Sequence, residues 1–177
     1  MLSNELRSAS QIVALVGLFF SILMFIPWLA SFAAGWKGGD HFLWSGFPSG
    51  FGCIIVLLAT RGETPKISAR FGILVVNFLW WIVPLICALP FILALPELTL
   101  IDAIFEATSG LTTTGATVLT DLIDQPRPIL LWRSLMQWVG GLGILSLGLI
   151  LLPFLRVGGM QLFRMESSDR ADKPLPR

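Results

Sequence analysis

Long apolar runs alternate with short polar segments along the 177-residue chain. A helix needs about 17–25 apolar residues to cross a bilayer, and four runs reach that length. They cover residues 12–34, 42–59, 71–95 and 129–155. We expect Pro27 to kink the first run, and Pro84 and Pro90 to bend the third, because proline lacks a backbone N–H. The pattern predicts an all-α integral membrane protein with four transmembrane helices.

A shorter apolar pattern precedes the fourth run. Apolar residues recur at helical spacing between 98 and 105, and Thr99 with Asp102 three residues later predicts an acidic variant of the N-terminal capping box. We expect Gly110 to end this helix as its C-terminal cap. Because about three turns cannot cross a bilayer, the segment predicts a re-entrant pore helix followed by non-helical backbone.

A polar stretch with the sequence LTTTGATVL (111–119) follows this predicted pore helix. Extended backbone at membrane depth is tolerated where protein buries it or where it lines a water-filled cavity. Its carbonyl oxygens can then replace the hydration shell of a cation, and Gly115 allows the positive φ that turns successive carbonyls the same way. The stretch predicts a filter loop for potassium, with an external turn as the simpler alternative.

Basic residues indicate the orientation, because Lys and Arg mark cytoplasmic loops. Arg61, Lys66 and Arg70 lie between the second and third runs, and Arg156 and Arg164 follow the fourth. We therefore expect both termini and the 60–70 loop inside, and the connections 35–41 and 96–128 outside. The second outer connection carries the acids that would attract cations: Glu97, Asp102, Glu106, Asp121 and Asp124.

Composition narrows the function classes. The chain is 55% hydrophobic and 13% charged, with a net charge of +1, and its mean hydropathy is +0.81. Such values fit a membrane protein and argue against nucleic-acid binding. Cys53 and Cys87 lie in apolar runs, which indicates small buried hydrophobes, and a single histidine leaves little room for a zinc site. An enzyme is disfavoured because no His, Cys and acid cluster converges within the predicted spans.

Arg133 lies five residues into the fourth run, where a charge is costly. Two interpretations stay open: its side chain reaches the outer interface beside Trp132, or it braces the pore helix through Glu106 or Asp102. Polar Asn77 and Gln137 predict hydrogen bonds between helices.

Glycine and tryptophan give two further expectations. The GGLG sequence at 140–143 predicts close helix packing. The seven tryptophans lie mostly near the ends of the runs, as interface anchors do.

The segments FEATSGLTTTGATVL and LLWRSLMQWVGGLGILSLGLILLPFLRVGGMQLFRME resemble the first pore repeat of TrkH-type potassium uptake proteins, in the Trk/Ktr/HKT superfamily. The resemblance covers roughly 70–177. It implies an N-terminal helix pair at 1–66, a helix–pore loop–helix repeat at 67–165 and a polar cytoplasmic tail at 166–177. In this family four such repeats surround one central pore.

The resemblance also assigns roles to residues. Thr112, Thr113, Thr114 and Gly115 would offer backbone carbonyls to potassium, with Thr113 and Thr114 as ligands, while Ala116 and Thr117 complete the outer part of the strand. Glu106 and Arg133 would support the pore helix. Potassium is the only ligand implied, with no covalent cofactor.

On this resemblance we expect potassium uptake across a bacterial cytoplasmic (inner) membrane, with this chain supplying one of four filter strands. The implied partners are the remaining pore repeats, a TrkA-like cytosolic nucleotide-binding regulatory subunit, a second copy in a homodimer and the lipid bilayer, with no nucleic acid. Because one repeat cannot close a pore, we expect either a truncated product or an assembly of four copies. A non-conducting structural fragment is the alternative function, and the choice between channel-like transport and symport stays open.

Overall fold

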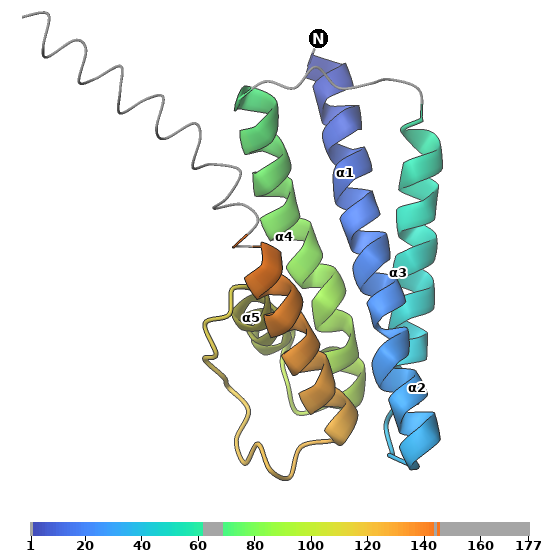
Figure 1. Ribbon diagram of the computed structural model, residues 1–177, viewed down its shortest axis with the longest axis vertical. Helices are drawn as coiled ribbons and strands as arrows, with labels where there is room; N and C mark the ends of the chain where they lie inside the picture. Colours follow the sequence, from blue (N-terminus) through green and yellow to red (C-terminus); the bar gives the residue numbers. More distant parts are fainter. Residues whose placement is uncertain (1, 62–68, 144, 146–177) are drawn as a thin grey trace, which may run out of the picture.

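The computed structural model describes residues 2–61, 69–143 and 145, and within these ranges it contains helices and loops but no strand. The labelled helices are α1 (Leu2–Leu23), α2 (Phe25–Ala34), α3 (Asp40–Ala59), α4 (Ala69–Ala94) and α5 (Leu100–Leu111). A further helix covers 127–143. Figure 1 shows α1, α3 and α4 as long neighbouring helices, with short α5 tilted beside α4 and helix 127–143.

Three segments are long and apolar enough to cross a membrane: Asn4–Ala34, Asp40–Ala59 and Phe71–Ala94. They confirm the first three predicted spans. The fourth predicted span begins as helix 127–143. Its remainder to 155 lies outside the described residues, as do Lys66, Arg156, Arg164 and the predicted tail at 166–177.

The first predicted span is longer than its apolar run and is broken once. Its polar start is helical from Leu2, and the break between α1 and α2 falls at Met24. Pro27 cannot donate the hydrogen bond that would reach the carbonyl of Leu23, so the interruption lies one turn before the proline. By contrast, Pro84 and Pro90 lie inside an unbroken α4.

Small residues let α1 and α3 approach closely. A Cβ on Gly46 would lie 3.1 Å from the Ser21 carbonyl oxygen, and one on Gly17 would lie 2.8 Å from Cys53 Sγ. The Ser21 and Ser49 hydroxyl oxygens are 2.9 Å apart, which joins the two helices by a hydrogen bond. The pair therefore packs through small and hydroxyl residues, as membrane helices commonly do.

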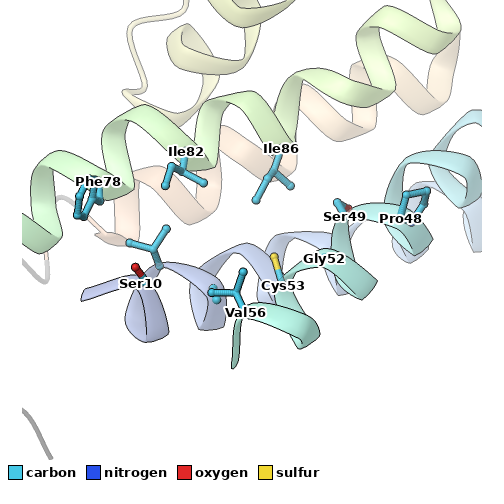
Figure 2. A pocket seen from close by; sticks show the side chains of 11 residues that line it. Ser10, Pro48, Ser49, Gly52, Cys53, Val56, Phe78, Ile82 and Ile86 are labelled. Atoms are coloured by element: carbon cyan, nitrogen blue, oxygen red, sulfur yellow. The ribbon is translucent and has the colours of Figure 1, made fainter. Parts of the chain in front are cut away.

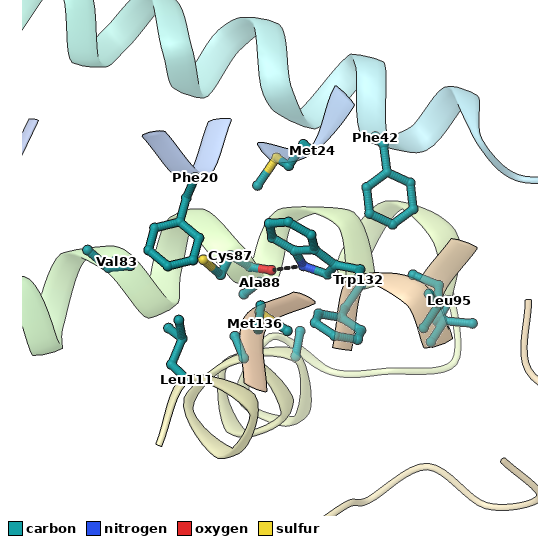
Figure 3. Close-up of a cluster of buried hydrophobic side chains, with 14 of the residues drawn as sticks. Phe20, Met24, Phe42, Val83, Cys87, Ala88, Leu95, Leu111, Trp132 and Met136 are labelled. Carbon is teal, nitrogen blue, oxygen red and sulfur yellow. Dashed lines mark hydrogen bonds between the residues drawn. The ribbon is translucent and has the colours of Figure 1, made fainter. Parts of the chain in front are cut away.

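The hydrophobic core lies where this pair meets α4, α5 and helix 127–143 (Figure 3). Trp132 is fully buried there, its ring meets Phe42 edge-on at 6.0 Å, and its indole N–H donates to the Cys87 carbonyl at 3.1 Å. The expectation that tryptophans anchor the interface is therefore wrong for Trp132, because it fills the centre of the bundle. Cys53 and Cys87 are buried free thiols, as predicted.

Asn77 also departs from its prediction. Its side-chain amide donates to the Ile73 carbonyl of the same helix at 2.8 Å, and the residue is exposed. The Ile73 carbonyl lies one turn before Asn77, within reach of its short side chain. The Asn77 amide therefore has an acceptor without a neighbouring helix.

Candidate functional site

Helix α5 starts at a capping box, as the sequence predicts. The Thr99 N–H and hydroxyl donate to Asp102 Oδ2 at 3.0 and 2.6 Å, and the Asp102 N–H donates to Thr99 Oγ1 at 3.2 Å. The bond from the Thr99 hydroxyl, followed by the one from its backbone, lowers the pKa of Asp102, because both favour the ionised carboxylate. The box fixes where the chain turns after α4 and enters the short helix.

The carboxyl end of α5 corrects the prediction for Gly110. The helix continues through Gly110 to Leu111, and Thr112 is the C-cap. A Cβ on Gly110 would lie 3.1 Å from Met136 Cε and 3.3 Å from Met136 Cβ. This glycine lets helix 127–143 approach, and it does not terminate α5.

Gly140 makes the second close approach between these helices. A Cβ at this position would overlap the carbonyl oxygen of Leu111, the last residue of α5. The predicted close packing of the GGLG sequence is confirmed at Gly140. Among the described residues, nothing lies within 4 Å of the Cβ position of Gly143, so the close contact in this motif is made by Gly140.

The backbone N–H groups that follow α5 turn back onto its last carbonyls. Thr112 donates to Thr108, Thr113 to Gly110 and Thr114 to Ser109, at 2.9, 3.1 and 3.0 Å. Two residues take positive φ here, Gly115 at 76° and Thr113 at 57°. The positive φ of Gly115 confirms the prediction for this residue. The positive φ of Thr113 could not be predicted from the sequence, because a β-branched residue rarely adopts this conformation.

The carbonyl oxygens of the same stretch behave differently from its N–H groups. Among the described residues, no donor reaches the carbonyl oxygens of Thr112, Thr113, Thr114 or Gly115, and residues 113–118 are exposed. The Ala116 carbonyl accepts from the Ser109 hydroxyl at 2.6 Å. The stretch therefore presents four free carbonyls, and the fifth is held against α5 by a serine that sequence reasoning did not single out.

Three side chains from three parts of the chain meet behind this stretch. Glu106 of α5 is buried, and its Oε1 accepts from the Thr117 hydroxyl at 2.6 Å and from the Val118 N–H at 2.7 Å. Arg133 of helix 127–143 lies 2.5 Å from Glu106 Oε2 and donates to Thr117 Oγ1 at 2.7 Å. Of the two interpretations of Arg133, the geometry favours bracing through Glu106, while Asp102 is engaged in its capping box.

The connection after α2 and the start of helix 127–143 meet at a second contact. The guanidinium carbon of Arg127 lies 5.8 Å from the centre of the Trp36 ring, a cation–π distance. This contact joins the connection after α2 to the first residue of helix 127–143. Both lie at the end of the bundle where α4 finishes and where the chain enters α5 (Figure 1).

Within the described ranges, no group of three or more His, Cys, Asp or Glu side chains is placed to hold a metal ion. The oxygens open to a cation at this site include the four backbone carbonyl oxygens of residues 112–115. Backbone carbonyls are neutral ligands that suit a large monovalent cation which exchanges its hydration shell quickly.

Comparison with known families gives one match. Residues 51–177 match the family model TrkH, described as "Cation transport protein". This range includes α4, α5, the 112–119 stretch and helix 127–143.

Individual relatives agree with the family match. The Trk system potassium uptake protein TrkI of Halomonas elongata is 48% identical over 98 residues, 55% of this chain and 20% of that protein. The Trk system potassium uptake protein TrkH of Escherichia coli is 40% identical over 161 residues, 90% of this chain and 33% of that protein. The chain thus spans about a third, or less, of the length of these relatives.

The fold has a solved counterpart. The crystal structure of the potassium transporter TrkH from Vibrio parahaemolyticus superposes with a TM-score of 0.80 at 34% identity, covering 94% of this chain and 36% of that one.

Proposed function

Because the chain belongs to the TrkH family of cation transport proteins, we propose that it serves potassium uptake by supplying one strand of a carbonyl-lined filter. Membership makes it a multi-pass membrane transport protein and not an enzyme, in agreement with the sequence. Beyond membership, we propose that potassium is the transported ion and that residues of the 112–119 stretch contact it. Its relatives are named as potassium uptake proteins.

The proposal rests on a difference in hydrogen bonding between the N–H groups and the carbonyl groups of the 112–119 stretch. Its N–H groups at 112–114 and 118 are taken up by α5 and by Glu106, whereas the carbonyls of Thr112 to Gly115 have no donor among the described residues. A cation needs free carbonyl oxygens on a backbone that does not move. Thr113 and Thr114 are proposed as the central ligands, and Ala116 and Thr117 as the outer support of the strand.

Glu106 and Arg133 are proposed to hold the strand from behind. A buried carboxylate that accepts two hydrogen bonds and faces a guanidinium is costly to disturb. The strand is therefore kept at one distance from α5 whichever ion occupies the pore. Potassium is the transported cargo, and the proposal includes no covalent cofactor.

The proposed orientation puts both ends of the chain in the cytoplasm of a bacterium, with the protein in its inner membrane. The amino end of α1 and the carboxyl end of α3 lie together, since Arg7 Nη2 donates to the Ala59 carbonyl at 3.4 Å. Arg61 follows at the same end, and α5 is entered from the opposite one (Figure 1). Arginines at one end favour that end as the cytoplasmic side.

A single strand does not enclose an ion, so the proposal requires partners. Ile101 and Phe105 of α5 are 78% and 43% exposed, and residues 113–118 are exposed as well. These surfaces suit contact with the remaining pore repeats, in the same protein or in other copies. A homodimer and a TrkA-like cytosolic nucleotide-binding subunit belong to the proposal on family grounds alone.

The test is potassium uptake in bacteria that lack their own uptake systems. This chain replaces the matching region of the Escherichia coli relative, and growth and uptake are measured at low potassium. We expect the hybrid to restore uptake and Gly115→Val to abolish it, since a β-branched residue resists positive φ. Gly35→Val is the matched control: Gly35 has φ 66 and open space, as Gly115 does, but lies in the loop after α2.

Three results would contradict the proposal: a correctly inserted hybrid without uptake, retained uptake in Gly115→Val, or equal loss in both glycine variants. Expression of the chain alone separates two forms of the proposal. Uptake by the chain alone indicates an assembly of copies. Uptake by the hybrid only indicates that the remaining repeats are needed.

A further inference from the structure

A groove of about 440 Å³ lies between α1, α3 and α4, away from the filter stretch. Apolar side chains from all three helices converge on it (Figure 2), and its lining includes Val13, Ala14, Val56, Phe78, Ile82 and Ile86. The helices that form it are the three membrane-crossing segments. The groove is therefore formed entirely by membrane-crossing helices.

The groove has the depth of one leaflet. Along α3 its lining extends from Pro48 to Val56, which at 1.5 Å per residue is about 12 Å. Half of a typical hydrocarbon core is about 15 Å. Its end at Val56 is one helical turn from Ala59, at the end of the bundle that carries the arginines.

Arg7 lies directly at this end. It sits one turn before Ser10, which lines the groove, and its side chain is exposed while Nη2 donates to the Ala59 carbonyl. A guanidinium has five N–H donors, so further donors stay available to an anion. Glu5 is two residues away, a spacing at which helical side chains do not share a face.

The groove also has unfilled space at its wall. Gly52 lines it, and a Cβ built there meets no atom within 4 Å. This helical glycine is not required by close packing, unlike Gly17 and Gly46 in the same helix pair. A methyl group at 52 would therefore displace none of the described protein atoms.

We propose that this groove holds one acyl chain of an anionic phospholipid whose phosphate is bound by Arg7 at the cytoplasmic face. An apolar slot of one-leaflet depth with a guanidinium at its mouth matches the two halves of such a lipid. Anionic headgroups of the cytoplasmic leaflet are attracted to basic residues near the membrane surface. The proposal rests on the proposed orientation of the chain, but it does not depend on the filter or on potassium.

The test is lipid retention by the purified full chain, measured by native mass spectrometry from micelles doped with phosphatidylglycerol or with phosphatidylcholine of the same acyl chains. We expect one retained phosphatidylglycerol and weaker retention of phosphatidylcholine. Arg7→Gln should reduce phosphatidylglycerol retention about fivefold, the ratio expected for one arginine near an anionic surface. Arg127→Gln, at the opposite end of the bundle, should leave it unchanged.

Gly52→Leu tests the acyl slot separately and should reduce retention of both lipids. Gly72→Leu in α4 is its matched control, since a Cβ there also meets none of the described atoms within 4 Å and the residue does not line the groove. Circular dichroism of each variant verifies the fold. Equal retention of both lipids by the wild type, no effect of Arg7→Gln, or no effect of Gly52→Leu would each overturn the proposal.

Discussion

Glu106 of α5 and Arg133 of helix 127–143 form an ion pair at 2.5 Å, with the Glu106 side chain fully buried and the Arg133 side chain 12% exposed. The Thr117 hydroxyl lies between them, donating to the first and accepting from the second. An acid on the short helix, a threonine on the loop and a base on the following helix thus form one unit. This unit links the 112–119 stretch to α5 and to helix 127–143.

Removing the base alone should be severely damaging. Arg133→Ala leaves the buried carboxylate without its counter-charge, and breaking such a pair from one side costs about 3–5 kcal/mol. We expect a lower midpoint in thermal unfolding and loss of uptake by the hybrid, with membrane insertion retained. The double variant Glu106→Gln/Arg133→Gln should be more stable than Arg133→Ala, because it buries no unpaired charge. A double variant as unstable as the single one would contradict this explanation.

Thr117→Val tests the central hydroxyl. Valine has nearly the same shape, but Glu106 Oε1 loses a donor, and Arg133 and the Leu119 N–H lose an acceptor. We expect a loss of about 1–3 kcal/mol in the free energy of unfolding, measured by denaturant titration in micelles. Thr120→Val is the control, because the Thr120 hydroxyl makes no hydrogen bond to any of the residues that the structure describes. Equal losses for both variants would show that the network does not hold the strand.

The GGLG sequence offers an internal comparison. A methyl group at Gly140 would overlap the Leu111 carbonyl, whereas one at Gly143 meets no atom of the described residues within 4 Å. Gly140→Ala should therefore displace α5 and abolish uptake by the hybrid, while Gly143→Ala should leave uptake near the wild-type rate. If the two variants behaved alike, the close approach would not matter for function.

The capping box predicts a pH dependence. Hydrogen bonds from Thr99 lower the pKa of Asp102 below its usual value of 3.8. A carboxylate with a lowered pKa contributes stability that is fully present above the usual pKa and is lost as the pH falls through the lowered one. The difference in melting temperature between wild type and Asp102→Asn should thus be constant above about pH 5 and shrink toward pH 2. The same difference at every pH would contradict the assignment.

Features set by neighbours in sequence could be predicted well. Thr99 and Asp102 are three residues apart and form their box within one turn, and Gly115 takes the positive φ that its lack of a side chain allows. The spans follow from apolar length, because the bilayer dictates it. The fold class and the interrupted first span could therefore be derived without coordinates.

Features set by tertiary contacts could not be predicted in the same way. Gly110 fits the sequence pattern of a helix C-cap, and only its contact with Met136 shows that it serves packing instead. The GGLG sequence predicts close packing, but only the contact with Leu111 assigns that packing to Gly140. Tryptophan commonly anchors helices at the membrane interface, but Trp132 is buried in the core. Ser109 has no local signal, since its acceptor is the carbonyl of Ala116 in the following loop. Each of these roles depends on a contact with another element of the fold, and the residues next to it in sequence do not reveal that contact.

The central claim is that the free carbonyls of residues 112–115 bind potassium. Anomalous diffraction from rubidium, a potassium analogue, in crystals of the assembled hybrid transporter tests it most directly. The account predicts rubidium peaks between the carbonyl oxygens of Thr112, Thr113, Thr114 and Gly115, and no peak bound by the Ala116 carbonyl, which Ser109 occupies. Rubidium in the pore without contact to any carbonyl of residues 112–115 would contradict it.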